Sequence, residues 1–391
     1  MNDLTPYGIK DPIKVMDNLY QLGQDAIVNI IQTSAAPQER KQLRTWGINA
    51  VAELLNKSPN TIRALEKKEN FPQPHKDENG RKQYTLELIN HIRKSSNSLF
   101  TRPIKSSPIV LPILNFKGGV GKSMTSLLLM QYLAIQGLKI LAVDLDPQAT
   151  LTTWLGFIPD IDLISDDTLA TTLLEKEDDI YRVIQKTYFT GIDIIPANLE
   201  LQNVELNLPL LTEEKITQLG SPLRRLNKAL NLIKNKYDVI IIDCPPNTGA
   251  LTMNAVSAAN SILITIPPSM PDFSSFIRLT KTLKRVFSVA ELKTLDFFRI
   301  LLTKHKGNIA ANKLDQLLRK LYGEYVLVNH MIDSTEIDNT GNALLSLYEK
   351  PYSTNTSTHR RAIEASNKVN SEIFSAFKEI WNHIEKGEQN V

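Results

Sequence analysis

The glycine-rich segment Lys117-Gly118-Gly119-Val120-Gly121-Lys122-Ser123 constrains the fold of this chain more than any other feature. An apolar run at 109–114 precedes it, and a helical segment at 123–136 follows it. A strand, a glycine-rich turn and a helix in this order are typical of a P-loop, in which backbone N–H groups close around phosphate oxygens. The helix directs the positive end of its dipole at the same anion. The order therefore predicts a nucleotide-binding domain.

The residue types in the loop suit phosphate chemistry. Glycines leave the backbone amides accessible, because no side chain stands between them and the ligand. We expect Lys122 to reach the outer phosphates as a point charge and Ser123 to offer its hydroxyl to Mg²⁺. The predicted nucleotide contacts are Lys117, Gly118, Gly119, Val120, Gly121, Lys122, Ser123 and Met124.

Apolar strands and helices alternate along the chain after residue 109. Strands that are apolar throughout and separated by helices predict an α/β fold, with a mostly parallel sheet covered by helices on both faces. Pro112 is unexpected in a central strand, because proline lacks the N–H that a ladder needs. We predict strands at 109–114, 139–143, 192–195, 239–242, 261–266 and 298–302, and helices at 123–136 and 223–236.

Three aspartates follow two of these strands. Asp144 and Asp146 come after the strand at 139–143, and Asp243 comes after the strand at 239–242. Ligands bind at the carboxyl ends of strands in open parallel sheets, so we expect these carboxylates beside the P-loop. A single Asp-Pro turn is more often structural, but three aspartates at two strand ends favour a function. Asp144, Asp243 and Ser123 are the predicted Mg²⁺ residues, and Asp146 is predicted to orient the attacking water.

The segment from residue 40 to residue 105 is strongly basic and contains a helix-turn-helix pattern. It holds 14 Lys/Arg against 6 Asp/Glu, a net charge of +8, although the whole chain carries only +3. Helical segments at 47–55 and 60–66 flank a turn, and an Asn-Gly turn downstream predicts a basic β-wing. A solvated basic surface and a plain helical hairpin remain the alternatives. The predicted DNA contacts are Ser58, Asn60, Thr61, Arg63, Arg81 and Lys82.

The P-loop departs from the common pattern, because Phe116 replaces its first glycine and Lys117 opens the loop. It resembles the deviant Walker A motif of the ParA/MinD family, and the stretches Asp144-Leu145-Asp146-Pro147-Gln148 and Ile240-Ile241-Ile242-Asp243-Cys244-Pro245-Pro246 resemble motifs of ParA-type proteins. The resemblance implies an ATPase that uses ATP/ADP and Mg²⁺ and works as a homodimer. It also implies that Lys117 reaches the nucleotide of the partner subunit, and that the catalytic residues are Asp146, Lys117 and Lys122.

Longer ParA proteins of plasmid partition systems resemble the whole chain in domain order. The resemblance implies an N-terminal dimerisation helix (1–40), a winged helix-turn-helix domain with a linker (41–106) and a P-loop ATPase domain (107–391). It further implies repression of the chain's own operon, non-specific binding of nucleoid DNA and stimulation by a ParB-like centromere-binding partner. Arg360 and Arg361 are candidates for non-specific DNA contacts, with an exposed basic turn as the alternative. Asn254 is a candidate to face the site after the strand at 239–242, and by analogy with the family the segment 266–269 contributes to recognition of the base.

Several classes of protein are disfavoured. No apolar run approaches the roughly 20 residues that span a bilayer, and no secretory signal is evident, so we expect a cytoplasmic, nucleoid-associated protein without membrane contact. The apolar stripe of the last helix, Ile373 to Ile384, lacks a basic opposite face, which favours core packing over membrane binding. One cysteine excludes reductase-type relatives with bridging iron–sulfur clusters. A nucleotide-sensing repressor and a MinD-like positioning ATPase remain as alternatives.

Overall fold

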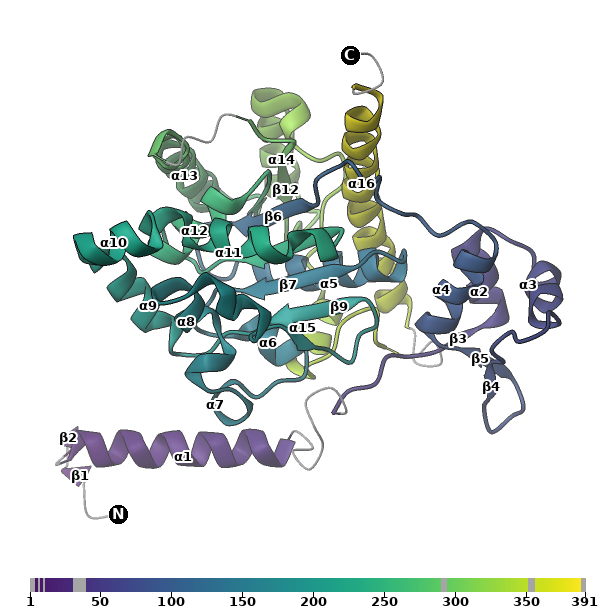
Figure 1. Ribbon diagram of the computed structural model, residues 1–391, viewed down its shortest axis with the longest axis horizontal. Coiled ribbons are helices and arrows are strands. Elements are labelled where there is room, and N and C mark those ends of the chain that lie inside the picture. The colour runs from purple at the N-terminus through teal and green to yellow at the C-terminus, as the bar shows by residue number, and fades with distance from the viewer. Residues whose placement is uncertain are drawn as a thin grey trace.

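The computed structural model describes residues 4–5, 8–9, 11–30, 40–289, 294–350 and 356–387. Its centre is a sheet of seven strands in the order β12-β11-β6-β10-β7-β9-β8, in which only β8 runs antiparallel to its neighbour. Helices cover both of its faces (Figure 1), which confirms the predicted α/β class. The strands are β6 (Ile109–Leu114), β7 (Ile140–Asp144), β8 (Gln185–Lys186), β9 (Ile192–Ile195), β10 (Val239–Asp243), β11 (Ser261–Ile266) and β12 (Phe297–Leu302).

Two apolar layers hold the sheet between the helices. One layer joins α5 and α16 to one face, and the other joins α8, α11, α12, α13 and α14 to the opposite face. The helices of this unit are α5 (Lys122–Ile135), α6 (Thr150–Trp154), α7 (Pro159–Asp162), α8 (Leu169–Leu174), α9 (Leu201–Asn207), α10 (Glu213–Leu219), α11 (Arg225–Ile233), α12 (Ala250–Ala258), α13 (Met270–Val289), α14 (Ile309–Tyr322), α15 (Thr335–Asn342) and α16 (Ser357–Gly387).

The six predicted strands are present, with bounds that shift by at most one residue. Pro112 lies in β6 between β11 and β10, so a central position is compatible with proline here. The N–H of Val110 donates to the Asn260 side chain next to β11, and residues two apart in a strand point the same way. The missing N–H of Pro112 therefore faces β11, whose pairing with β6 begins only at Ile113.

The basic segment forms a small unit beside the sheet. Helices α2 (Ile48–Leu55) and α3 (Pro59–Glu66) are followed by a small antiparallel sheet and by α4 (Leu86–Ser95). The sheet order is β3 (Trp46–Gly47), β5 (Lys82–Tyr84), β4 (His75–Lys76). Buried Trp46, Ile62 and Tyr84 lie in its core. We call residues 46–95 the N-terminal module.

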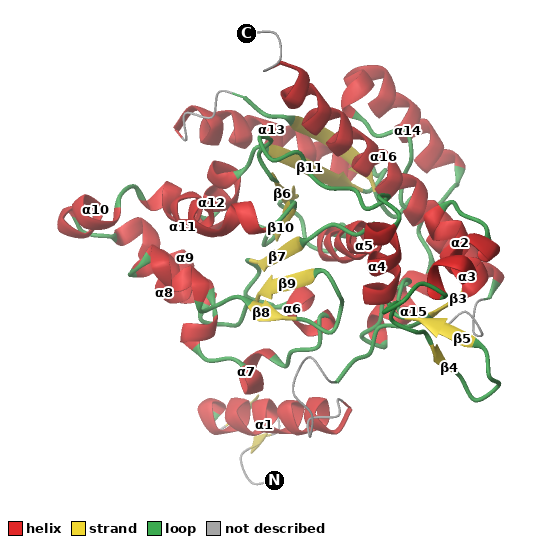
Figure 2. Cartoon of the chain, turned by 45° about the vertical axis from the view of Figure 1, so that its right-hand side comes forward, coloured by secondary structure: helices red, strands yellow, loops and turns green. Residues whose placement is uncertain are grey.

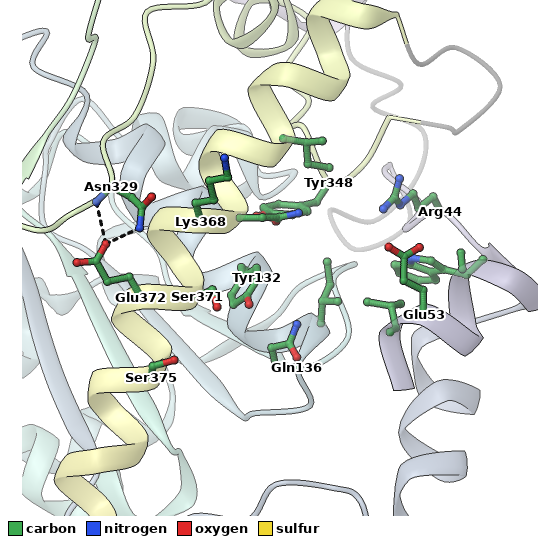
Figure 3. Close-up of a pocket in the computed structure, with 16 residues that line it drawn as sticks. Arg44, Glu53, Tyr132, Gln136, Asn329, Tyr348, Lys368, Ser371, Glu372 and Ser375 are labelled. Atoms are coloured by element: carbon green, nitrogen blue, oxygen red, sulfur yellow. Dashed lines mark hydrogen bonds between the residues drawn. The ribbon is translucent and has the colours of Figure 1, made fainter. Parts of the chain in front are cut away.

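Open space separates part of this module from the main unit. A cavity of about 700 Å³ lies between α2, the end of α5 and α16. Figure 3 shows Arg44 and Glu53 on the module's side, opposite Tyr132, Gln136 and Glu372. Direct packing occurs at Gly137, where an added Cβ would lie 2.7 Å from the Leu99 side chain. Asn90 and Arg93 of α4 also lie within 4 Å of this position, with α4 beside the end of α5 (Figure 2). The buried apolar residues of the module and of the main unit belong to one cluster, so the two units pack against each other beside the cavity.

The terminal helices differ in burial. Helix α1 (Pro12–Ile30) exposes its apolar residues Ile13, Met16, Leu19 and Leu22. The side chains of the apolar residues Ile27, Ile30 and Ile31, in the segment 1–40 expected to be helical, lie outside the described part of the chain. The stripe of α16 is buried at Ile373, Phe374, Phe377 and Trp381, which confirms core packing, and the side chain of Ile384 is not described. Among the described residues, no helix is long and apolar enough to cross a membrane.

Candidate nucleotide site

The P-loop joins β6 to α5 at the carboxyl edge of the sheet. Gly119 and Gly121 adopt φ values of 72° and 85°, which disfavour residues with a side chain. Asn115 braces the loop, because its amide nitrogen donates to Thr265 O at 2.6 Å and its oxygen accepts from Lys117 N at 3.0 Å. The Thr303 hydroxyl donates to Val120 O at 2.8 Å, so the end of β12 supports the loop from the other side.

Asp243 lies next to the start of α5 and is fully buried. The Ser126 hydroxyl lies 3.0 Å from Asp243 Oδ1, and Ser123 also hydrogen-bonds to this carboxylate. Its Oδ2 is buried and has no hydrogen-bond partner among the described residues. Burial raises the pKa of Asp243, while the bond from Ser123 and the charge of Lys122 oppose the rise. An uncompensated carboxylate oxygen beside a serine hydroxyl fits the oxygen ligands of Mg²⁺.

Asp144 and Asp146 have different surroundings. Asp144 pairs in register with Asp243 on the neighbouring strand, as expected for two strand ends. Both of its oxygens accept hydrogen bonds, one from Asp146 N and the other from the backbone and hydroxyl of Thr152. Burial, followed by repulsion from Asp243, raises the pKa of Asp144. Asp146 is half-buried and lines the cavity next to the P-loop. Asp144 therefore shapes the turn, whereas Asp146 faces the site.

The two loop lysines point in different directions. Lys122 is buried, and its Nζ lies 3.4 Å from Lys117 O. Burial lowers the pKa of Lys122, and the charge of Asp243 opposes this. The Lys117 side chain is nearly half exposed, and its Nζ lies 2.6 Å from Asp272 Oδ1 on α13. Asp272 also accepts a hydrogen bond from Ser269. The side chain of Lys117 is thus directed at α13 rather than over the phosphate loop.

A cavity of about 590 Å³ extends from the P-loop between α6 and α15. Besides the loop, Met124 and Asp146, it is lined by residues that the sequence analysis missed, because they follow β12 or lie far from any motif. Its far end is apolar and suits a planar base. The missed residues are Trp154, Thr303, Lys304, Met331, Ile332, Asp333, Ser334, Ile337, Asp338, Gly341 and Asn342. Residues in or next to the motifs complete the lining, namely Thr125, Leu128, Gln148, Thr150 and Pro246.

Asn254 and the segment 266–269 are not among the residues that line this cavity. Asn254 is buried and tied to α11, because its Oδ1 accepts from Leu226 N and its amide donates to Pro222 O. Its predicted position at the site is wrong, since these bonds direct the side chain into the core. Pro267, Pro268 and Ser269 line a neighbouring cavity with Lys117 instead.

The predicted DNA residues of the N-terminal module lie on α3 and its wing. Ser58 caps α3 by accepting from Thr61 N at 3.1 Å, and Arg63 donates to Asn60 Oδ1 at 2.8 Å. These residues and Arg81 are exposed, whereas Lys82 is ion-paired with the buried Glu66. Arg81 therefore has the more available charge of the two wing residues.

Two basic surfaces lie on the main unit. Arg360 and Arg361 are exposed near the start of α16. Helix α13 adds a surface that the sequence analysis missed, with Arg278, Lys281, Lys284 and Arg285 all exposed. No acidic residue occurs on α13 after Asp272, so this charge is uncompensated along the helix.

Comparisons with known proteins agree with this architecture. A family model described as an AAA domain matches residues 109–294. The chain is 35% identical to the putative replication protein A of Sinorhizobium fredii, over 88% of this chain and 89% of the relative, and 32% identical to Protein SopA of Escherichia coli strain K12, over 87% and 90%. A solved structure described as a partition protein shares the fold, with a TM-score of 0.65 at 18% identity, over 94% of this chain and 99% of that one. The chain therefore belongs to the ParA/SopA family of partition ATPases.

Proposed function

We propose that this chain binds ATP or ADP with Mg²⁺ at the P-loop and that its ATP hydrolysis drives partition of plasmid DNA. The observation that carries the proposal is the buried, unpartnered Asp243 Oδ2 beside Ser123 and Lys122. Buried Lys122 acts on the buried carboxylate of Asp243, which also lies beside a second buried carboxylate, Asp144, and this local excess of negative charge favours a bound cation. Mg²⁺ would be held through Ser123 and Asp243, and it would neutralise phosphate charge.

Hydrolysis needs a group that orients the attacking water. Asp146 suits this role, because it is half-buried and lines the cavity. Within the described part of the chain, only one of its carboxylate oxygens accepts a hydrogen bond, from Gln148 N at 3.0 Å. Asp144 would contribute indirectly, by holding the turn that carries Asp146, because the Asp146 N–H donates to Asp144 Oδ1. Lys122 places a positive charge at the phosphates.

Dimer formation would use the other lysine. Lys117 is partly exposed at the edge of the site and is bound to Asp272 in the monomer. To reach the nucleotide of a second copy, it would exchange this ion pair for phosphate oxygens. Helix α1 supports a homodimer independently, because its exposed apolar face needs a partner.

DNA would be bound at two places. The exposed residues of α3 would read an operator in the major groove and so repress the chain's operon. The basic residues of α13 or α16 would hold nucleoid DNA through its phosphates without sequence preference. A ParB-like partner bound at a centromere site would stimulate hydrolysis and release the DNA. The burial of the α16 stripe gives no support to a MinD-like membrane role.

The test is the rate of ATP hydrolysis by the full chain with Mg²⁺, measured alone, with duplex DNA, and with DNA plus the protein encoded by the neighbouring gene. We expect a slow basal rate that rises most when both are present. A rate that is the same in all three conditions would contradict the partner-stimulated cycle. Absence of ATP binding would contradict the assignment of the P-loop itself.

A further inference from the structure

The segment before the N-terminal module lies against the main unit through three basic side chains. We call residues 40–44 the strap. Arg40 forms an ion pair with Asp162, and Arg44 donates to Lys350 O at 3.2 Å. Lys41, between them, is directed at the walls of the nucleotide cavity. The strap is thus fixed at several points along its length.

Lys41 is almost completely buried, with a side chain that is 12% exposed. Its Nζ lies 2.7 Å from Trp154 O, 2.7 Å from Leu344 O and 2.7 Å from Glu349 Oε1. The two carbonyl oxygens accept hydrogen bonds from the ammonium group, and the Glu349 carboxylate forms an ion pair with it. A buried lysine with these three partners fixes the relative positions of the groups that it joins.

Two of these partners belong to opposite walls of the cavity. Trp154 ends α6 and lines the cavity, and its indole N–H donates to Gly341 O at 3.1 Å. Leu344 follows α15, whose residues Gly341 and Asn342 line the cavity from the other side. Lys41 therefore bridges α6 and the end of α15 from behind the cavity.

The third partner continues the network to the P-loop helix. Glu349 accepts hydrogen bonds from Gln131 on α5 at 3.4 Å and from Ser346 N at 2.8 Å. The ammonium group also lies 4.6 Å above the Tyr188 ring. Lys41 thus adds a connection between α5, α6 and the segment after α15.

The bridged walls enclose the apolar end of the cavity rather than its phosphate end. Met124, Trp154 and Ile337 lie there. The walls are close, because a Cβ added at Gly341 would stand 3.5 Å from both the Trp154 ring and the Met124 methyl group. A small change in wall spacing would alter the contact area offered to a planar base.

We infer that Lys41 is a positioning residue for the base of the bound nucleotide, supplied by a strap that lies outside the P-loop sheet. The inference rests on the proposed nucleotide site. It adds that Lys41 sets the distance between the two walls of the cavity that would enclose the base. The phosphate end is built separately by Asn115 and Thr303, so loss of Lys41 leaves it intact. Affinity for the base and affinity for the phosphates are therefore separable in this chain.

The test compares two ligands in the full-length protein. Binding of ATP and of inorganic tripolyphosphate, each with Mg²⁺, is measured by calorimetry for the wild type and for Lys41→Met. We expect the variant to bind ATP about tenfold more weakly, the scale of a modest misfit in an apolar pocket, and to bind tripolyphosphate as the wild type does. An equal loss for both ligands, or an unchanged ATP affinity, overturns the inference.

A second variant separates a loss of base positioning from a loss of folding. Lys41→Met leaves the Glu349 carboxylate buried without its cation, which is destabilising. The double change Lys41→Met and Glu349→Gln removes both charges, and we expect the same selective loss of ATP affinity with a cooperative thermal transition. Lys186→Met is the matched control, because it breaks an exposed ion pair with Asp193 at the sheet edge. Reduced ATP affinity in the control would overturn the inference.

A third measurement needs no substitution. Because binding linkage is reciprocal, a base held between the walls should hold the strap in return. We expect ATP to slow amide hydrogen exchange in residues 40–44 of the wild type and tripolyphosphate to leave it unchanged. Exchange that is unaffected by ATP contradicts the inference, whereas a wild type that binds neither ligand contradicts the proposed nucleotide site.

Discussion

The carboxyl edge of the main sheet and the N-terminal module hold their charged side chains in opposite ways. At the sheet edge, Lys122, Asp144 and Asp243 are buried, and an oxygen of Asp243 lacks a partner. On α3, Asn60 and Arg63 are exposed and bonded to each other. Buried charge without full compensation is costly and indicates a missing ligand. Exposed charge costs little, so the α3 surface alone does not identify what it binds.

The largest effect should come from removing the buried cation. Lys122→Ala should abolish nucleotide binding, with at least about a hundredfold loss in affinity, because a charge-assisted contact to phosphate disappears from a buried site. Calorimetry with ATP and Mg²⁺ measures the loss, and circular dichroism checks the fold. If the variant still bound ATP tightly, the buried charge at the sheet edge would not mark the nucleotide site, and the comparison between the two regions would fail.

A second substitution separates binding from chemistry at the same edge. Asp146→Ala should lower the rate of hydrolysis about 10²- to 10⁴-fold, the usual contribution of a positioned acid or base. Nucleotide binding and ATP-dependent dimers should persist, because among the described residues the hydrogen bonds of Asp146 run to Asp144 and Gln148 and not to the P-loop. Single-turnover assays and light scattering measure the two properties. Unchanged hydrolysis would show that Asp146 has no part in turnover.

A substitution on the exposed surface of α3 should affect DNA binding and leave the nucleotide chemistry unchanged. Arg63→Ala should weaken operator binding by about 1–3 kcal/mol, the range of one good base contact, while ATP hydrolysis stays at the wild-type rate. Footprinting on the operator and an ATPase assay provide the two measurements. Lys57→Ala, one residue before the α3 cap, is the control on the same module. An unaltered footprint for Arg63→Ala would leave the α3 surface without an assigned role.

The features that could be predicted from the sequence depend on residues that lie close together along the chain. The P-loop, its flanking strand and helix, and the aspartates at strand ends follow from short motifs and from the rule that parallel strands end at one edge. The far wall of the cavity could not be predicted, because Trp154, Ile337 and Gly341 meet only through tertiary packing of α6 against α15. The position of Asn254 was wrong for the same reason, since its partners on α11 come from another part of the chain.

The smallest expected effect tests the unpaired buried charge directly, through pH. Burial raises the pKa of Asp144 and Asp243 above the value near 4 of an unfolded carboxyl. The native state therefore binds protons more tightly, and the free energy of unfolding should fall as pH rises from about 5 to about 8. Mg²⁺ binds the ionised carboxylate, so it should reduce this loss of stability at high pH. We expect Tm at high pH to be a few degrees higher with Mg²⁺ than with chelator. Thermal unfolding with chelator and with Mg²⁺ measures the difference. Asp243→Asn should lose the Mg²⁺ effect, and equal pH slopes in the wild type with and without Mg²⁺ would contradict a cation site at Asp243.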